Sequence, residues 1–438
     1  MGQPCFVGLD IGTSGCRAIA IDSLGGEVSH AEVAIRAPAR AASGRIEQDP
    51  EHWWRASCQV LGALAARLGS HSPAALCVDA TSATLLLADA RGRPLGPALM
   101  YNDQSAAEAA ARIAPVAPAQ SPALGASASL AKLIALGDRL GAAPGTRALH
   151  QADWIGGRLS GCFDVSDWNN ALKLGFDVEG LGWPGWVLTL VPQTIALPRI
   201  VAPGSLIGRL DGTVAAAIGF PPETAVLAGT TDSTAAAIAA GVSRPGDAVT
   251  SLGSTLVVKV VSEHPVNASR YGVYSHRFGD HWLVGGASNS GGAVLRQFFS
   301  DGELEALSRA IDPETDTGLD YYPLAGRGER FPRQAPDLEP RLQPRPADPV
   351  RFLQGLLEGI ADIEAEGYAR LAELGAAIPT RVRTVGGGAA NAVWTRIRAR
   401  RLGCPVEPAA RPEAAFGAAT LALSGARAAA LVRNGDGR

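Results

Sequence analysis

The sequence lacks the features that take a protein to a membrane or a nucleic acid. No uninterrupted apolar stretch reaches the roughly 20 residues that a membrane-spanning helix needs. Asp10 and a turn interrupt the N-terminal region, where a signal peptide would need an unbroken apolar run. The formal net charge is −3, and no run of lysine or arginine stands out. These absences predict a cytoplasmic protein that binds neither membranes nor nucleic acids.

Several common metal and nucleotide signatures are also missing. There is no GxxxxGK[ST] loop, and the glycine-rich turn at Gly386 lacks the GxGxxG spacing of a dinucleotide fold. The scattered cysteines form no Cys-x-x-Cys pair and have no nearby histidine to complete a zinc site. Any use of ATP must therefore proceed without a P-loop, and buried reduced thiols are expected. The six cysteines are Cys5, Cys16, Cys58, Cys77, Cys162 and Cys404.

Length and composition predict an α/β protein of two domains. The chain has 438 residues, 47% of them hydrophobic, which is too long for one ordinary core. From Cys5 onward the pattern gives three strands, then a helix after Asp49 and a further strand, which is the order of a ribonuclease-H-like unit. The same order returns from residue 248. We therefore expect domains at residues 1–242 and 243–438.

Two short turns between apolar, β-branched runs look like one device used twice. Residues 10–15 and 251–255 are both predicted to be β-hairpin tips that carry glycines and hydroxyls. Glycine lets backbone N–H groups approach a phosphate closely, and the hydroxyls add donors. The alternative is a pair of ordinary hairpin turns that bind nothing. The candidate phosphate ligands are Gly12, Thr13, Ser14, Gly253, Ser254 and Thr255.

The two turns differ at their first position. Asp10 begins the first turn, where Ser251 begins the second. A single carboxylate beside phosphates can hold a hydrated Mg²⁺, whereas a second carboxylate in the other turn would mostly repel the phosphates. The asymmetry predicts a magnesium ligand at Asp10.

Asp232 lies where an apolar strand gives way to an alanine-rich helix. An aspartate at this place caps the helix by accepting backbone N–H groups. It can also accept the proton of a substrate hydroxyl that attacks a terminal phosphate. The two roles are compatible.

Four other segments allow a binding role but have simpler interpretations. Residues 386–391 form a glycine-rich turn between a strand and a helix, which suits a flat ring or a phosphate. Residues 101–104 fit a solvated loop, and residues 127–132 fit a helix start in which Lys132 faces water. The proline- and arginine-rich residues 321–349 fit a surface excursion or linker.

Taken together, these segments resemble the FGGY family of carbohydrate kinases over nearly the whole chain. Residues 8–14 look like its first phosphate motif and residues 251–255 like its second, while residues 127–133 are similar to its serine-lysine signature. Residues 228–232 resemble its catalytic aspartate segment, and residues 386–394 with 413–419 its adenosine motif and last helix. Residues 328–332 are similar to a surface segment of these kinases.

The resemblance implies an α/β fold of two actin-like, ribonuclease-H-like domains with an interdomain cleft for ATP and a sugar. It implies that Asp232 is the catalytic base and that Asp10 acts through Mg²⁺, with Asp232 near the same ion and water between. The adenosine contacts implied are Gly387, Gly388, Ala389 and Asn391. The sugar contacts implied are Asp10, Thr81, Ser82, Asp103 and Asp232.

Departures from the family pattern bear on the substrate. Residues 79–84 stand where xylulose kinases carry a Met-His pair. Ser233 replaces a common glutamine, and Tyr101 replaces a common tryptophan. Residues 398–401 replace a common Ala-Asp pair. The short chain, Asn169-Asn170 and residues 288–293 resemble the plant and cyanobacterial branch that looks like D-ribulose kinases.

We therefore expect an ATP- and Mg²⁺-dependent kinase that converts D-ribulose to D-ribulose 5-phosphate, acting as a monomer or homodimer. The alternatives are a kinase for D-xylulose, another ketose or a polyol. A more distant one is a regulator of the same fold that binds nucleotide and sugar without catalysis.

Overall fold

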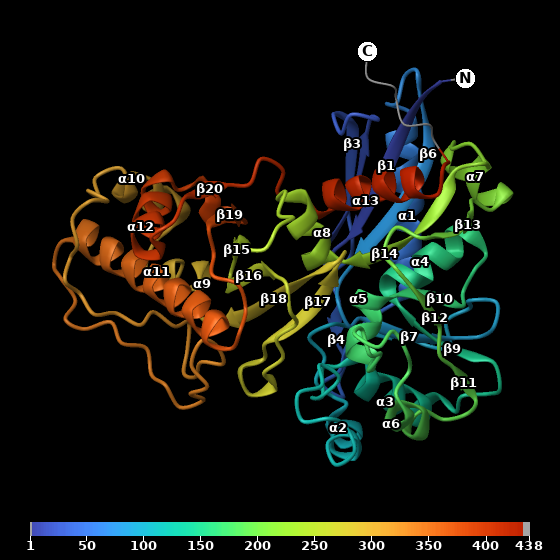
Figure 1. The fold of residues 1–438 in the computed structure, drawn as a ribbon, viewed down its shortest axis with the longest axis horizontal. Coiled ribbons are helices and arrows are strands. Elements are labelled where there is room, and N and C mark those ends of the chain that lie inside the picture. The colour runs from blue at the N-terminus through green and yellow to red at the C-terminus, as the bar shows by residue number, and fades with distance from the viewer. Residues whose placement is uncertain (1, 432–438) are drawn as a thin grey trace. The chain divides into compact units, whose positions relative to one another are not determined.

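The computed structural model describes residues 2–431, which form two compact units (Figure 1). Unit 1 holds the chain up to Ala239 and again from Glu413 onward, and unit 2 is Ala240–Pro412. Within the described residues, no helix is long and apolar enough to cross a bilayer. All six cysteine thiols are free, and Cys5, Cys16 and Cys77 are buried as expected, whereas the other three are only half-buried.

Unit 1 is built on a six-stranded mixed sheet. Its first three strands form an antiparallel meander, and the next two strands join in parallel. β1 is buried on both faces over most of its length, which explains its nearly continuous apolar sequence. The spatial order is β13 (Leu206–Arg209), β14 (Ala225–Thr231), β6 (His71–Ala80), β1 (Gln3–Ile11), β2 (Gly15–Ile21) and β3 (Glu27–Ala34).

Helices and smaller sheets complete unit 1. Helix α1 (Pro50–Ala65) starts as the sequence predicts, because the Asp49 carboxylate accepts the Glu51 N–H at 3.0 Å and Pro50 opens the first turn. The other helices are α2 (Ala107–Ile113), α3 (Ser129–Leu140), α4 (Gln151–Ser160), α5 (Trp168–Ala171), η1 (Leu172–Leu174), α6 (Gly185–Leu190), α7 (Gly212–Ile218), α8 (Asp232–Ala239) and α13 (Ala414–Ala428). A second sheet has the order β11 (Ile195–Ala196), β9 (Thr146–His150), β7 (Leu85–Ala88), β8 (Ala98–Leu99), β5 (Ile46–Gln48) and β4 (Ala39–Arg40), and β10 (Val165–Asp167) pairs with β12 (Arg199–Val201).

Unit 2 repeats the strand order of unit 1, so the repeat predicted from the sequence is confirmed. The series β18-β16-β15-β19-β20 matches β3-β2-β1-β6-β14 in order and in strand directions. The complete sheet is β17 (Tyr274–Phe278), β18 (His281–Ser288), β16 (Leu256–Ser262), β15 (Asp247–Leu252), β19 (Arg381–Val385) and β20 (Val406–Pro408). Its helices are η2 (Ser269–Tyr271), α9 (Gly292–Leu295), α10 (Asp301–Ser308), α11 (Pro349–Glu373), η3 (Gly387–Ala390) and α12 (Ala392–Leu402).

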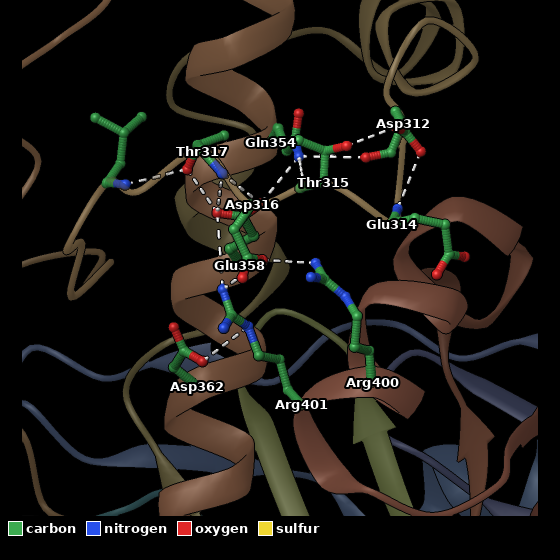
Figure 2. A network of polar contacts seen from close by, with 11 residues as sticks. Asp312, Glu314, Thr315, Asp316, Thr317, Gln354, Glu358, Asp362, Arg400 and Arg401 are labelled. Atoms are coloured by element: carbon green, nitrogen blue, oxygen red, sulfur yellow. Dashed lines mark hydrogen bonds and ion pairs between the residues drawn. The ribbon is translucent and has the colours of Figure 1, made fainter.

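A network of charged side chains ties α12 to α11 and to the loop after α10 (Figure 2). Arg400 and Arg401 of α12 contact the Asp316 carboxylate at 2.6 Å and 3.0 Å, and Arg401 also reaches Asp362 of α11 at 3.2 Å. Glu358 of α11 accepts hydrogen bonds from the backbone N–H and the hydroxyl of Thr317 in the same loop. The loop therefore fixes one side of α12 on α11.

The last helix does not belong to the unit that the sequence assigned to it. The expected boundary between residues 242 and 243 lies close to the division at Ala240, but α13 packs against β1, β6 and α8 of unit 1 (Figure 1). A second domain at residues 243–438 therefore differs from unit 2. Sequence order suggested the assignment, whereas the small side chains of α13 fit the unit 1 sheet.

The proline- and arginine-rich residues 321–349 are not a simple surface excursion. Tyr321, Tyr322 and Phe331 are almost fully buried in the core of unit 2. Glu329 is buried as well, and its carboxylate accepts hydrogen bonds from Ser288 Oγ at 2.6 Å and from the Asn289 N–H at 2.8 Å. The segment lacks periodicity because single side chains, not a regular face, anchor it.

The contact between α13 and α8 depends on a glycine. A Cβ atom added at Gly417 would lie 1.9 Å from the Ala235 carbonyl oxygen, so the backbones of the two helices meet without room for a side chain. Overpacking of this kind forces backbone shifts and typically costs about 1–3 kcal/mol.

We therefore expect Gly417→Ala to lower the free energy of unfolding by about 2 kcal/mol, measured by urea denaturation. Gly62→Ala in α1 is the matched control, because an added Cβ there meets no atom within 4 Å. Helix propensity should make that control slightly more stable, by about 0.5–1 kcal/mol. Equal behaviour of the two variants would contradict the close contact.

Candidate active site

Three carboxylates gather at one edge of the unit 1 sheet. Asp10 lies near the end of β1 and is the register partner of Asp79 near the end of β6. Thr230 of β14 is the register partner of Asp79 on the other side, and Asp232 follows two residues later. Because β1, β6 and β14 run parallel, their carboxyl ends meet at this edge. The structure thus brings Asp10 and Asp232 together as expected, and it adds Asp79, which the sequence analysis named only as part of a loop.

Burial and mutual repulsion raise the pKa of two of these carboxyl groups. Burial and the charge of Asp232 raise the pKa of Asp10 to about 6, against the opposing effect of the Arg17 charge. Burial, followed by the charges of Asp10 and Asp232, raises the pKa of Asp79 well above its usual value. Both carboxyl oxygens of Asp79 are buried and have no hydrogen-bond partner among the described residues, so its charged form is strongly disfavoured.

The same edge fits a hydrated cation better than a fully coordinated one. Among residues 2–431, no three histidine, cysteine, aspartate or glutamate side chains converge closely enough to hold a metal ion. Mg²⁺ keeps several waters and typically takes one or two carboxylates together with phosphate oxygens. Asp10 and Asp232 provide such carboxylates, and a dication would relieve the repulsion that raises the pKa of Asp10.

Asp232 is the first residue of helix α8, as the sequence predicts, and its side chain lies at the helix N-terminus. Its Oδ1 accepts the N–H of Ser233 at 2.6 Å. The partial positive charge at a helix N-terminus also suits a carboxylate at this place. The base role remains a prediction that this geometry permits.

The first predicted hairpin is confirmed as a hairpin. β1 and β2 are joined by a tight turn in which the Gly12 N–H donates to the Gly15 carbonyl at 2.9 Å. Thr13 is half-buried and Ser14 is exposed. Their proposed role as phosphate donors is not tested by this geometry.

The second predicted hairpin is confirmed as well, and a neighbouring segment braces it. β15 and β16 meet at the pair Leu252 and Leu256, which leaves Gly253, Ser254 and Thr255 at the tip. The Gly292 N–H donates to the Gly253 carbonyl at 2.9 Å, and Arg296 Nη2 donates to Ser254 Oγ at 2.9 Å.

Arg296 is a candidate site residue that no pattern in the sequence indicates. Its exposed guanidinium lies beside a predicted phosphate-binding hydroxyl. Only the close pairing of residues 290–293 with the hairpin brings it there, and no local motif marks it.

The glycine-rich turn lies against the second hairpin. Gly386 has a φ of 86°, and an added Cβ would lie 2.8 Å from the Leu252 carbonyl oxygen. Gly387 is open, since a Cβ there meets nothing within 4 Å, whereas Gly388 is packed against Leu252. The two segments predicted to bind nucleotide are therefore adjacent within unit 2. Ala389 is half-buried in η3 of the same turn.

Asn391 has two structural hydrogen bonds. Its Oδ1 accepts the Trp394 N–H at 3.0 Å, which caps α12, and its Nδ2 donates to Ser308 Oγ at 2.9 Å. The adenosine contact predicted for Asn391 would have to be made in addition to these bonds.

Thr81 belongs to a buried network that shapes the loop after β6. Its hydroxyl donates to Gln151 Oε1 at 2.6 Å and lies 2.6 Å from the hydroxyl of Thr84. The Nε2 atom of Gln151 is buried and has no hydrogen-bond partner among the described residues, whereas Ser82 is half-buried. Gln151 comes from α4, far along the chain, so the sequence analysis did not find it. Sugar binding by Thr81 and Ser82 remains a prediction.

The expectation for Lys132 is wrong, and the expected solvated loop at residues 101–104 holds for Tyr101, Asn102 and Gln104 but not for Asp103. Lys132 does not face water, because its ammonium is fully buried and donates to the carbonyls of Ala83 at 2.8 Å and Met100 at 2.6 Å. Asp103 is not in a solvated position either, since it is fully buried and accepts the N–H groups of Ile46 at 2.7 Å and Ser105 at 3.0 Å. These bonds give Asp103 a structural role, and its predicted sugar contact has no support here.

Comparison with known proteins agrees with this architecture. Models of the N- and C-terminal domains of the FGGY family of carbohydrate kinases match residues 5–121 and 248–426. A xylulose kinase of Streptomyces coelicolor is 30% identical and covers 98% of this chain and 90% of its own. The solved structure of a xylulose kinase from Rhodospirillum rubrum gives a TM-score of 0.83 at 24% identity, covering 97% of this chain and 90% of that one. Plasmodium falciparum glycerol kinase with ADP gives 0.86 at 16% identity, with the same coverage.

The two repeated units and these structural neighbours define a two-domain, actin-like ATPase fold. The chain belongs to the FGGY family of carbohydrate kinases. It is therefore a phosphotransferase that acts on a sugar, in a family whose phosphoryl donor is ATP. The resemblance and fold class inferred from the sequence are confirmed.

The buried Lys132 makes a specific stability prediction. We expect Lys132→Met to lower the free energy of unfolding by about 2–3 kcal/mol at pH 7, because two buried carbonyls would lose their donor. Burial lowers the pKa of Lys132 from 10.5 to about 7. Between these values the unfolded chain holds a proton that the folded chain does not, so the lysine protein gains stability as pH rises.

The loss in free energy of unfolding caused by Lys132→Met should therefore grow by roughly 1 kcal/mol per pH unit between pH 7 and pH 9, measured by urea denaturation. Arg112→Met removes an exposed cation in the same unit and should change stability by about 0.5 kcal/mol or less at both pH values. A cost that is constant over this range would show that the lysine stays charged in the folded protein.

Proposed function

We propose that this kinase transfers the γ-phosphoryl group of ATP to the terminal 5-hydroxyl of a ketopentose, with D-ribulose as the first candidate. The products are D-ribulose 5-phosphate and ADP. The observation that supports this most is the position of Asp232, at the end of β14 and at the edge that also carries Asp10 and Asp79. A non-catalytic sensor would have no use for a base in this position.

Asp232 acts as the base in the proposed reaction. Its carboxylate takes the proton of the sugar hydroxyl as that oxygen attacks the γ-phosphorus. The bond from the γ-phosphorus to the bridging oxygen breaks, and ADP leaves. Asp79 lies beside Asp10 as its register partner, and burial favours its neutral form, so the charge at this edge rests mainly on Asp10 and Asp232.

The remaining residues bind and orient. Asp10 and Asp232 would both hold Mg²⁺ through water. The ion, when bound, would neutralise charge on the phosphates. Each hairpin tip offers backbone N–H groups and hydroxyls as phosphate donors. The open backbone at Gly387 gives a flat ring a surface to lie on.

D-ribulose is favoured by the loop after β6, and D-xylulose by the comparisons. Residues 79–84 replace the Met-His pair of xylulose kinases, and Thr81 and Thr84 are held in a hydroxyl and amide network. The relatives reported above include a xylulose kinase that matches almost the whole chain, so D-xylulose is the second candidate. Other ketoses and polyols are less favoured candidate substrates.

A sugar panel tests the proposed activity. ADP release should be measured with Mg²⁺, ATP and D-ribulose, D-xylulose, L-ribulose, D-fructose, glycerol or ribitol. We expect the highest kcat/KM with D-ribulose, because the loop at residues 79–84 offers hydroxyls where a xylulose kinase offers a Met-His pair. A preference for D-xylulose would select the second candidate, and no turnover with tight ATP binding would defeat both.

Asp232→Asn separates the base role from the cap role. Asparagine still caps a helix but cannot accept the proton, so we expect kcat to fall by about 10²–10⁴-fold while ADP affinity, measured by calorimetry, stays nearly unchanged. Asp211→Asn is the matched control, because Asp211 caps α7 by accepting the Thr213 and Val214 N–H groups. A near-normal rate for Asp232→Asn would mean that this carboxylate is only a cap.

A further inference from the structure

A buried ion pair joins α11 to α12 in the interior of unit 2. Arg398 of α12 forms a two-pronged contact with Glu364 of α11, with Nε to Oε2 at 2.6 Å and Nη2 to Oε1 at 2.7 Å. Both side chains are about 1% exposed. This pair differs from the charged network of Figure 2, whose arginines remain partly accessible.

The ion pair also reaches two strands of the sheet. Arg398 Nη1 donates to Thr384 Oγ1 of β19 at 2.7 Å, and Thr250 Oγ1 of β15 donates to Glu364 Oε1 at 2.5 Å. The Tyr368 hydroxyl lies 2.8 Å from the same Thr250 hydroxyl. Thr250 and Thr384 are direct register partners. One network therefore fixes two adjacent strands and two helices at a single level.

Both strands end at the segments proposed to bind nucleotide. β15 ends at Leu252 and continues into the hairpin tip, while β19 ends at Val385 and continues into the turn at Gly386. The two segments touch, since an added Cβ at Gly386 would lie 2.8 Å from the Leu252 carbonyl oxygen. Thr250 lies three residues before the hairpin tip at Gly253, and Thr384 lies two residues before Gly386.

Stability alone does not account for a charged pair at this place. Removing two charges from water is costly, and well-packed apolar residues of similar volume often hold two helices as well or better. A two-pronged guanidinium–carboxylate contact fixes direction and distance, which an apolar contact does not. Donors that bind phosphate need such fixed geometry, because small displacements weaken binding.

We propose that Glu364 and Arg398 are positioning residues that hold the second hairpin and the glycine-rich turn in register for nucleotide binding. This inference rests on the proposed function of those two segments. It assigns the network to nucleotide affinity, with no part in sugar binding or proton transfer.

The test compares an apolar pair with the native pair. Glu364→Leu/Arg398→Leu removes both charges together, so that neither is left buried alone, and Thr384→Val removes one hydroxyl with little change in shape. Glu305→Ala/Arg309→Ala, an exposed pair on α10, is the control. For each protein we would measure the KM for ATP, the KM for the sugar, kcat, the calorimetric Kd for ADP and the melting temperature.

We expect the double leucine variant to raise the KM for ATP and the Kd for ADP at least about fivefold, and Thr384→Val about twofold. The KM for the sugar, kcat and the melting temperature should stay close to those of the parent and of the control. Unchanged ADP affinity in a folded variant, or an equal rise in both KM values, would overturn the proposal. If the double variant does not fold, Thr384→Val decides by the same criteria.

Failure of the proposed function is distinguishable from failure of this inference. A parent protein that phosphorylates no sugar would refute the proposed reaction, whereas the Kd for ADP would still report on positioning. Conversely, a parent that turns over sugar while the variants bind ADP normally would refute the positioning role alone.

Discussion

The confinement of three carboxyl groups to one edge of a sheet is the constraint on which the site depends. Parallel strands end side by side, so Asp10, Asp79 and Asp232 lie at the same edge, where Asp10 and Asp79 are buried and Asp232 is half-buried. Like charges at one such edge are unfavourable, and the raised pKa values of Asp10 and Asp79 are the response. Burial favours the neutral form of Asp79, which lowers the repulsion at this edge. In the proposed reaction, a hydrated cation would lower it further.

The two units share the same strand order but differ in the residues at the ends of their central strands. In unit 1, the central strands end in carboxylates suited to proton transfer and a cation. In unit 2, the corresponding strands β15 and β19 end in glycines and hydroxyls, and their charged residues lie behind the edge in the Glu364–Arg398 pair. In the proposed reaction, unit 1 would supply the acid–base groups and unit 2 the hydrogen-bond donors for phosphate.

Features set by neighbouring residues were predictable from the sequence, and features set by distant partners were not. Both hairpins, the capped start of α1 and the helix start at Asp232 depend on local turn and capping chemistry, and the structure has all of them. Lys132 was misplaced because its partners are carbonyls of distant loops, which no periodicity reveals. Residues 398–401 were recognised as unusual, but only the packing of α12 on α11 explains Arg398.

The return of α13 to the first unit has a consequence for how the chain becomes folded. One face of the unit 1 sheet, including Phe6, Ile19 and Cys77, is covered by alanines of α13 such as Ala415 and Ala418. Chains are made from the N-terminus at about 5–20 residues per second, and domains generally fold as units. All of unit 2 is synthesised before α13, so unit 2 can fold first. Until α13 is made, one apolar face of the unit 1 sheet stays uncovered. Unit 1 is therefore the first unit to be started during synthesis and the last to be completed.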